Sequence, residues 1–323
     1  MKTLEQFPRV SLGIFPTPIR KLENISRLLN TQVYIKRDDL TGLGLGGNKT
    51  RKLEFLLADA RRQGAEIVFT TGGAQSNHAM LTAAAANRLG MRAILILKKR
   101  GVTACRGNQL LEKLMGTEVR FMDTDDYSDI YAEMDRLGAA LGRPYYKIPC
   151  GGSNALGSLG YVACAREIRD QGMAFDHLVC AEGSGGTMAG LALGAKLFLP
   201  GTTVHGMMVD TDPFDEITPR LMRQAAALLE AEVSVTEEDY RLWDLCGPGY
   251  AIPSPEGNAA VALMAEQEGL FLDPVYTGKA FAGLLKLAGE GLFRPEDRVL
   301  FLHTGGAGGL FAVDMAEESE ARP

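Results

Sequence analysis

Short runs of apolar and β-branched residues alternate with segments of helical periodicity along most of the chain, and few folds are compatible with such a pattern. Between two of these runs, Leu53, Leu56, Leu57 and Ala60 recur at i, i+3, i+4 and i+7, which marks one face of a helix. Alternation of strand and helix predicts an α/β fold with mainly parallel sheets flanked by helices. The candidate strands span residues 32–38, 66–72, 92–99, 118–123, 145–151, 177–183, 203–210 and 298–305.

The length of the chain indicates more than one hydrophobic core. With 323 residues, 46% of them hydrophobic, the chain is long enough for two lobes. It contains no internal repeat, low-complexity tract or obvious flexible linker. We therefore expect a second lobe to be inserted within the first rather than to follow it.

Charge and composition narrow the classes of partner. The net charge is −6, and acidic and basic residues are mixed without a basic stripe for nucleic acid. No charge-free apolar run is long enough to span a bilayer, and the first residues lack the apolar stretch of a signal peptide. The five cysteines are scattered, and the four histidines form no metal-spaced pair. We expect a cytoplasmic protein with reduced thiols and with no metal, membrane or nucleic-acid partner.

Glycine-rich or polar turns lie at the ends of several candidate strands. In parallel sheets, ligands gather at the carboxyl ends of the strands. We therefore expect these turns to converge on one site. They comprise residues 44–49, 72–77, 151–157, 183–187 and 304–309.

The most glycine-rich stretch, Gly42–Thr50, raises the alternative of a nucleotide-binding protein. Gly42, Gly44 and Gly47 satisfy G-x-G-x-x-G, but the next strand ends in "TTGG" without the acidic residue that would hold a ribose. A Walker loop needs a glycine directly before its lysine, and Asn48 stands there instead. The sequence disfavours this alternative.

The segment "EGSGGTMAG" is a better candidate for phosphate binding. It follows a candidate strand and opens a helix that should run to about Leu199. Successive backbone N–H groups at Gly183, Gly185 and Gly186, with a helix N-terminus behind them, would form an anion-binding nest. Hydroxyls of Ser184 and Thr187 could add donors; the alternative is an ordinary strand-to-helix turn.

A separate lysine accompanies this turn. Lys49 stands at a predicted helix start, where a cation is unfavourable against the helix dipole unless it has a function. Pyridoxal phosphate combines a phosphate with an aldehyde that reacts with lysine, so it would fit both features. The alternative for Lys49 is a solvated side chain in the first helical turn.

Seven segments, in order along the chain, resemble the family of D-cysteine desulfhydrases and 1-aminocyclopropane-1-carboxylate deaminases. These are pyridoxal-phosphate enzymes of the tryptophan synthase β-like fold. The resemblance runs from about Phe15 to Phe311. It is carried by "GGNKTRKLEFL", "GGAQSNHA", "GGSNALGSLGYV", "GSGGTMAG", "GPGYAIP", "LDPVYTGKA" and "FLHTGGAGGLF".

The resemblance implies roles for individual residues. Lys49 would bind the cofactor covalently and Lys52, on the same helix face, would help to hold its phosphate together with residues 183–187. Asn77 would bind the phenolic oxygen of the cofactor. The turn from Ser76 to His78 would receive the substrate carboxylate on backbone N–H groups. Tyr250 and Tyr276 would face the substrate, and Ser76 could also orient or accept a proton, or simply cap a helix.

Two threonines bear on the reaction. Deaminases that open the cyclopropane ring resemble this chain but carry glutamate at the position of Thr277 and leucine at that of Thr304. Here a hydroxyl, from Thr304 or else from Thr277, would face the pyridine nitrogen, and it stabilises a pyridinium less than a carboxylate does. The weaker electron sink favours β-elimination, so we expect a D-cysteine desulfhydrase that releases pyruvate, sulfide and ammonia. Thr277 is also expected at the substrate.

The resemblance has one departure and leaves alternatives. Family members usually carry arginine and glutamine where Met80 and Leu81 stand, so the pocket could differ. An L-cysteate sulfo-lyase or a 1-aminocyclopropane-1-carboxylate deaminase remains an alternative, as does a carrier of the cofactor without catalysis. The partner is expected to be a small amino acid and the enzyme a homodimer. We predict a large domain of residues 1–48 and 160–323, and an inserted small domain of residues 49–159.

Overall fold

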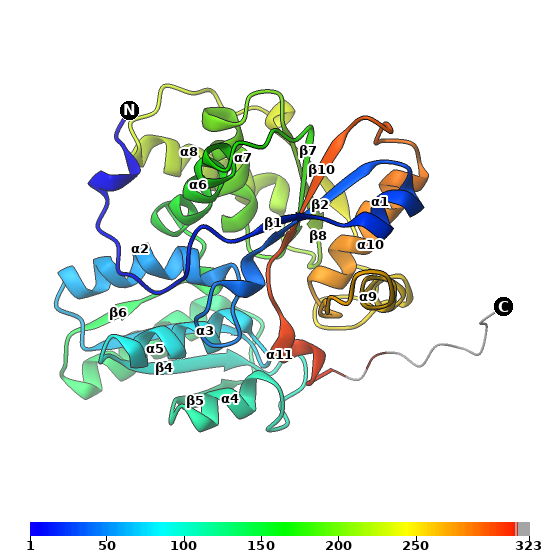
Figure 1. The fold of residues 1–323 in the computed structure, drawn as a ribbon. Helices are drawn as coiled ribbons and strands as arrows, with labels where there is room; N and C mark the ends of the chain where they lie inside the picture. Colours follow the sequence, from blue (N-terminus) through cyan, green and yellow to red (C-terminus); the bar gives the residue numbers. More distant parts are fainter. Residues whose placement is uncertain (314, 316–323) are drawn as a thin grey trace.

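The computed structural model describes residues 1–313 and 315, and their strands form two sheets (Figure 1). The larger sheet has the order β1-β2-β10-β7-β8-β9, in which β1 alone runs antiparallel to its neighbour. Its strands are β1 (Ile19–Lys21), β2 (Gln32–Arg37), β10 (Arg298–His303), β7 (His177–Glu182), β8 (Thr203–Met208) and β9 (Tyr240–Asp244). The smaller, all-parallel sheet has the order β5 (Glu118–Met122), β4 (Arg92–Lys98), β3 (Ile67–Gly73) and β6 (Tyr145–Lys147).

The predicted fold class is confirmed, and each predicted strand lies on an observed one. The sequence reading missed β1 and β9, which form the two edges of the larger sheet. β1 has only three residues, and β9 carries the exposed Arg241 and Asp244, so neither has the continuous apolar run of a central strand.

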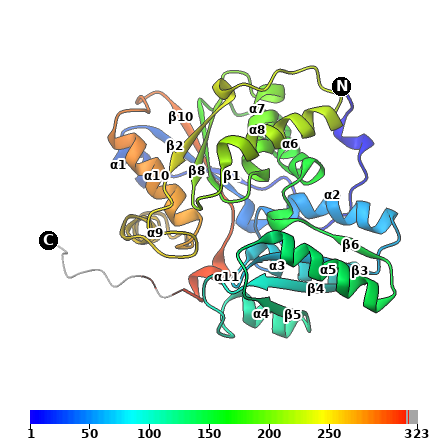
Figure 2. The same cartoon turned by 180° about the vertical axis from the view of Figure 1, so that it is seen from behind.

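Helices cover both faces of the larger sheet, as Figures 1 and 2 show. On β10 the residues alternate: Leu300 and Leu302 join the core with α6–α8, while Val299 and Phe301 join the core with α1, α9 and α10. This alternation is the period of two that a strand buried on both faces requires. The helices are α1 (Glu23–Leu29), α6 (Ala155–Asp170), α7 (Gly186–Phe198), α8 (Phe214–Leu228), α9 (Pro255–Glu268) and α10 (Thr277–Gly289).

The smaller sheet has cores of its own. Val68 and Leu95 pack with α2 and α3 on one face, whereas Ile67 and Phe69 pack with α5 on the other. The helices here are α2 (Lys49–Arg62), α3 (Asn77–Arg88), α4 (Asn108–Leu114) and α5 (Tyr127–Leu141). Short helical turns complete the described chain: η1 (Leu4–Gln6), η2 (Asp38–Leu40), η3 (Cys150–Gly152), η4 (Glu237–Asp239) and α11 (Ala307–Leu310).

Helix α2 contacts both parts of the molecule. Its predicted face, Leu53 to Ala60, is fully buried against the smaller sheet, while Phe55 joins the core of α6 and α7. The predicted domain boundaries, residues 49–159 against 1–48 and 160–323, stay a prediction. Within the described residues, no helix is long and apolar enough to cross a membrane.

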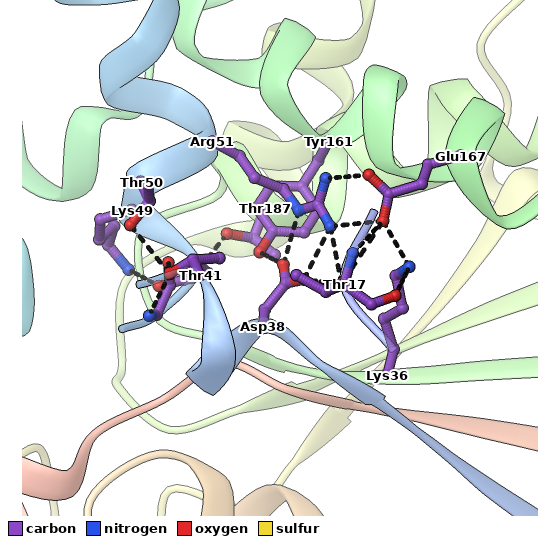
Figure 3. Close-up of polar contacts among 12 residues, drawn as sticks. Thr17, Lys36, Asp38, Thr41, Lys49, Thr50, Arg51, Tyr161, Glu167 and Thr187 are labelled. Atoms are coloured by element: carbon purple, nitrogen blue, oxygen red, sulfur yellow. Dashed lines mark hydrogen bonds and ion pairs between the residues drawn. The ribbon is translucent and has the colours of Figure 1, made fainter. Parts of the chain in front are cut away.

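A buried polar cluster fixes the first turn of α2 to the larger sheet (Figure 3). The guanidinium of Arg51 donates to Asp38 at 2.8 Å and to Glu167 at 2.9 Å. Lys36 donates to the same Glu167 at 2.5 Å, and Tyr161 donates to Asp38 at 2.6 Å. Because these charges are buried and paired, they hold α2 in one register against β2 and α6.

Candidate active site

A cavity of about 200 Å³ lies where the carboxyl ends of β3 and β7 approach the start of α2. All five expected turns contribute residues to its lining. The turn at 304–309 contributes only Thr304, and the turn at 44–49 contributes Asn48 and Lys49. The predicted convergence of turns is therefore found. The predicted site residues that line the cavity are Lys49, Ser76, Asn77, His78, Gly183, Ser184, Gly185, Thr187, Tyr250, Tyr276 and Thr304.

The glycine-rich loop before α2 does not itself line this cavity. At Gly46, where φ is 75°, an added Cβ would stand 1.8 Å from the backbone oxygen of Asp39. The amide of Gly47 donates to the hydroxyl of Thr41 at 2.9 Å, and the amide of Asn48 donates to the backbone oxygen of Thr304 at 3.0 Å. The glycines thus permit a close fold of the loop that brings Lys49 beside the end of β10, and the loop offers no nucleotide site.

The side chain of Lys49 lies at the cavity in a low-dielectric setting. Its Nζ donates to Oδ1 of Asn48 at 3.0 Å, and the amide nitrogen of Asn48 donates to the hydroxyl of Thr187 at 3.0 Å. Burial lowers the pKa of Lys49 to about 8, although Cys150, Glu182 and Asp273 oppose the shift. A larger fraction of this amine is therefore unprotonated, and nucleophilic, near neutral pH than of a solvated lysine.

The turn after β7 opens α7 and lines the cavity with most of its residues. Gly185 has φ of 87°, and at Gly186 an added Cβ would stand 2.8 Å from Nζ of Lys52. That ammonium lies behind the turn, where it donates to the backbone oxygen of Gly151 at 3.1 Å and to Oγ of Ser153 at 3.2 Å. The amide of Gly186 donates to the same Ser153 hydroxyl at 3.2 Å. N–H groups, hydroxyls and the amine of Lys52 together suit a phosphate.

The turn at the start of α3 presents a second set of donors. Oγ of Ser76 accepts from the amide of Ala79 at 3.2 Å, so Ser76 caps α3 and also lines the cavity. Nδ2 of Asn108 donates to Oδ1 of Asn77 at 2.7 Å, which leaves Nδ2 of Asn77 to donate into the site. His78 hydrogen-bonds through Nε2 to Thr70 at 2.8 Å, and burial lowers its pKa well below the ordinary value, so the ring is neutral.

Two tyrosines meet at the cavity. The hydroxyls of Tyr250 and Tyr276 are 2.5 Å apart, and their rings are packed edge to face. Burial raises the pKa of both phenols, so both are protonated at neutral pH. Arg100 lies over the ring of Tyr250, with its Cζ 5.2 Å from the centroid, and it also lines the cavity.

The two threonines separate in the structure. Thr304 lines the cavity, whereas Thr277 is buried outside it at the start of α10. The hydroxyl of Thr277 donates to Asp273 at 2.7 Å and accepts from the amide of that residue at 2.8 Å. Since Thr277 is fully buried and does not line the cavity, it is not placed to contact a substrate, contrary to the sequence expectation. Lys52 and Gly186 also lie behind the lining rather than on it.

Met80 and Leu81 do not line the cavity. Both are buried in the core between α2, α3 and β4, and Met80 touches the glycine loop near Gly44. The expectation that the pocket differs from that of family members with arginine and glutamine at these positions stays a prediction.

Sequence reasoning missed several residues of the cavity. Asn48, Ser153 and Glu182 stand inside recognised motifs, where each directly precedes or follows a glycine and could have been read as part of the turn. Cys150 was read only as a scattered thiol, yet its Sγ lies 3.2 Å from the hydroxyl of Tyr127 at the cavity. Asn108 left no signal, because its contact with Asn77 joins positions 31 residues apart.

Comparison with known proteins agrees with this geometry. The family model described as "Pyridoxal-phosphate dependent enzyme" matches residues 10–305. A D-cysteine desulfhydrase of Serratia proteamaculans is 44% identical over 96% of this chain and 97% of its own. A putative 1-aminocyclopropane-1-carboxylate deaminase of Pyrococcus horikoshii is 44% identical over 95% of this chain and 94% of its own.

A solved structure gives the same result. The crystal structure of a protein described as an ACC deaminase homologue superposes with a TM-score of 0.90 and 43% sequence identity, covering 95% of this chain and 94% of that one. The fold, the cavity and these relatives lead to one conclusion: this chain belongs to the pyridoxal-phosphate-dependent enzymes.

Proposed function

We propose that the chain is a β-elimination lyase that converts D-cysteine to pyruvate, hydrogen sulfide and ammonia. Its family and its relative from Serratia support a pyridoxal-phosphate lyase acting on a small amino acid. The relative named as a putative deaminase is equally similar, so identity alone does not choose the reaction. The observation that carries the choice is that Thr304, with a neutral hydroxyl, lines the cavity.

The cavity residues fit the cofactor as a set. Residues 183–187, with Ser153 and Lys52 behind the turn, would hold its phosphate. Lys49 would form the covalent bond to its aldehyde carbon, and Thr304 would face its ring nitrogen. The free amide group of Asn77, fixed by Asn108, would donate to its phenolic oxygen. When bound, pyridoxal phosphate withdraws the electron pair that remains on Cα after the α-proton leaves.

The chain's own residues would supply proton transfer and orientation. Backbone N–H groups from Ser76 to His78, at the start of α3, would bind the substrate carboxylate, as the helix dipole favours. Nζ of Lys49 would accept the α-proton, because its lowered pKa makes the neutral amine available. The protonated pair Tyr250 and Tyr276 would stand at the departing sulfur. Loss of sulfide gives 2-aminoacrylate, which water converts to pyruvate and ammonia.

The two candidate reactions differ in how much negative charge the pyridine ring of the cofactor must stabilise. Opening a cyclopropane must stabilise charge without a good leaving group, whereas a thiolate leaves readily and needs less help. A hydroxyl at the ring nitrogen stabilises its protonated form less than a carboxylate would. This difference favours elimination of sulfide over ring opening.

The test is a side-by-side assay at equal enzyme of D-cysteine, L-cysteine, L-cysteate, D-serine and 1-aminocyclopropane-1-carboxylate. We expect pyruvate and sulfide from D-cysteine and no 2-oxobutyrate from the cyclopropane substrate. A faster reaction with the cyclopropane substrate would contradict the role given to Thr304. A faster reaction with L-cysteate would support the lyase reaction but would make L-cysteate, and not D-cysteine, the substrate.

We further propose that the enzyme is a cytoplasmic homodimer. The cysteines support a reducing compartment, because five occur free in the described residues. Light scattering of the eluting protein should give twice the monomer mass of 34.8 kDa. A monomer would refute the dimer and leave the reaction untouched.

A further inference from the structure

Glu182 is an acidic residue in a place where a carboxylate is costly. It is the last residue of β7, only 1% exposed, and it lines the cavity directly before the turn that would hold the cofactor phosphate. An ionised carboxylate that is buried without full pairing carries a large desolvation cost. No step of the proposed reaction uses this residue.

The contacts of Glu182 show what its carboxylate does in this structure. Oε1 accepts from the amide of Gly185 at 2.5 Å, and the amide of Ser184 also stabilises the anion. Oε2 is buried and has no hydrogen-bond partner among the described residues. Oε1 of Glu182 therefore accepts a hydrogen bond from an N–H group of the turn expected to bind the phosphate. Oε2 of the same carboxylate accepts none from the described residues.

Two anions cannot share this nest without a change in charge. A phosphate dianion beside an ionised Glu182 would face a like charge in a low-dielectric site, which favours protonation of the weaker acid. A protonated Glu182 would instead offer an O–H donor to the phosphate. Resting on the proposed function, we infer that Glu182 takes up one proton as the cofactor phosphate binds, so that cofactor binding and protonation of this carboxyl are coupled.

The charged groups around Glu182 agree with such a switch. Burial raises the pKa of Glu182 to about 7, against the stabilising effects of the Gly185 amide and of Lys52 and Lys49 on α2. On its own strand, burial and Glu182 raise the pKa of Cys180, so that thiol stays neutral. Arg220 on α8, with Asp210 and Asp212 after β8, lines the same cavity.

Lys52 is the rival proton acceptor. Burial and the nearby Lys49 lower its pKa well below the usual range, so a phosphate could also protonate this amine. A substitution of Glu182 distinguishes proton uptake by Glu182 from uptake by Lys52, because it removes only the carboxyl group.

The experiment is titration calorimetry with pyridoxine 5′-phosphate, which has no aldehyde to react with Lys49. It is run near pH 8, where the free phosphate (pKa about 6) is a dianion, in two buffers of different ionisation enthalpy. Lys49 lines the same cavity and has a pKa of about 8, so it titrates in this range in both proteins. We therefore expect the wild-type protein to take up about one proton more per ligand than Glu182→Gln does. Between about pH 7.5 and 8.5, the affinity of the wild-type protein should fall nearly tenfold more than the affinity of Glu182→Gln.

The matched control is Glu112→Gln. Glu112, on α4, is also buried and unpartnered among the described residues, and burial raises its pKa to about 8, but it does not line the cavity. This variant should take up the same proton as the wild-type protein. Glu182→Ser serves as a second test, and the circular dichroism of each variant verifies its fold.

Three results would overturn the inference. The first is proton uptake by Glu182→Gln equal to that of the wild-type protein, which would assign the proton to Lys49 or Lys52. The second is an absence of uptake by the wild-type protein, and the third is a loss of uptake in Glu112→Gln. Failure of the wild-type protein to bind pyridoxine 5′-phosphate, together with no lysine labelled after borohydride reduction with pyridoxal phosphate, would overturn the proposed function as well.

Discussion

Lys49 illustrates how a single side chain gains reactivity from its position. It begins α2, where the helix dipole disfavours a cation, and it is partly buried, which disfavours the charged form further. Asn48 accepts a hydrogen bond from its amine and ties it to Thr187 at the start of α7. The same two features make the amine available both for covalent bonding and as a base.

Labelling tests the role of Lys49. After incubation with pyridoxal phosphate and reduction with borohydride, we expect peptide mapping to find the pyridoxyl group on Lys49. The neighbouring Lys52 is an internal control, because its ammonium donates to Gly151 and Ser153 behind the turn. Lys49→Ala should lower kcat at least about a thousandfold, as expected for loss of both nucleophile and base, and should still bind pyridoxine 5′-phosphate. Label on Lys52 would refute the assignment.

At the scale of elements, the site depends on the turn that leaves each strand. The rule that ligands gather at the carboxyl ends of parallel strands located the turns at residues 72–77 and 183–187 from the sequence alone, and the cavity lies there. Periodicity likewise identified the buried face of α2. Neither rule reveals the direction of one side chain, which is why Thr277, bound to Asp273, was misplaced and Glu182 was overlooked.

The turn that opens α7 can be tested with a pair of glycines. Gly185 and Gly201 both have φ of 87°, but an added Cβ at Gly185 would stand 2.4 Å from Ile217, whereas at Gly201 it would meet nothing within 4 Å. Each alanine variant should lose about 1 kcal/mol of stability from backbone strain. Only Gly185→Ala should also weaken binding of pyridoxine 5′-phosphate, by more than about tenfold, because its turn must shift. If calorimetry gave the two variants equal affinities for pyridoxine 5′-phosphate, this turn would have no role in phosphate binding.

At the scale of the whole molecule, a buried ion cluster joins α2 to the larger sheet. Arg51→Met should lower the free energy of unfolding by about 3–5 kcal/mol, because the buried Asp38 would lose its ion pair and Glu167 would keep only Lys36. The control is Arg136→Met on α5, which breaks an ion pair with Glu133 whose arginine is 63% exposed and should cost under about 1 kcal/mol. Urea denaturation measures both. Equal losses would mean that the cluster contributes no more than a surface pair.

The order of strands in the larger sheet has a consequence for how the chain is made. β10, at residues 298–303, lies between β2 and β7 and pairs with both, yet the ribosome synthesises it after every other strand of the sheet. The smaller sheet, whose strands fall between residues 67 and 147, can pair its strands long before that point. Until β10 emerges, the N–H and C=O groups of β2 and β7 that pair with it lack their partners and are open to neighbouring chains. Among the residues that the structure describes, the last strand to be translated is thus the one that joins the two halves of the larger sheet.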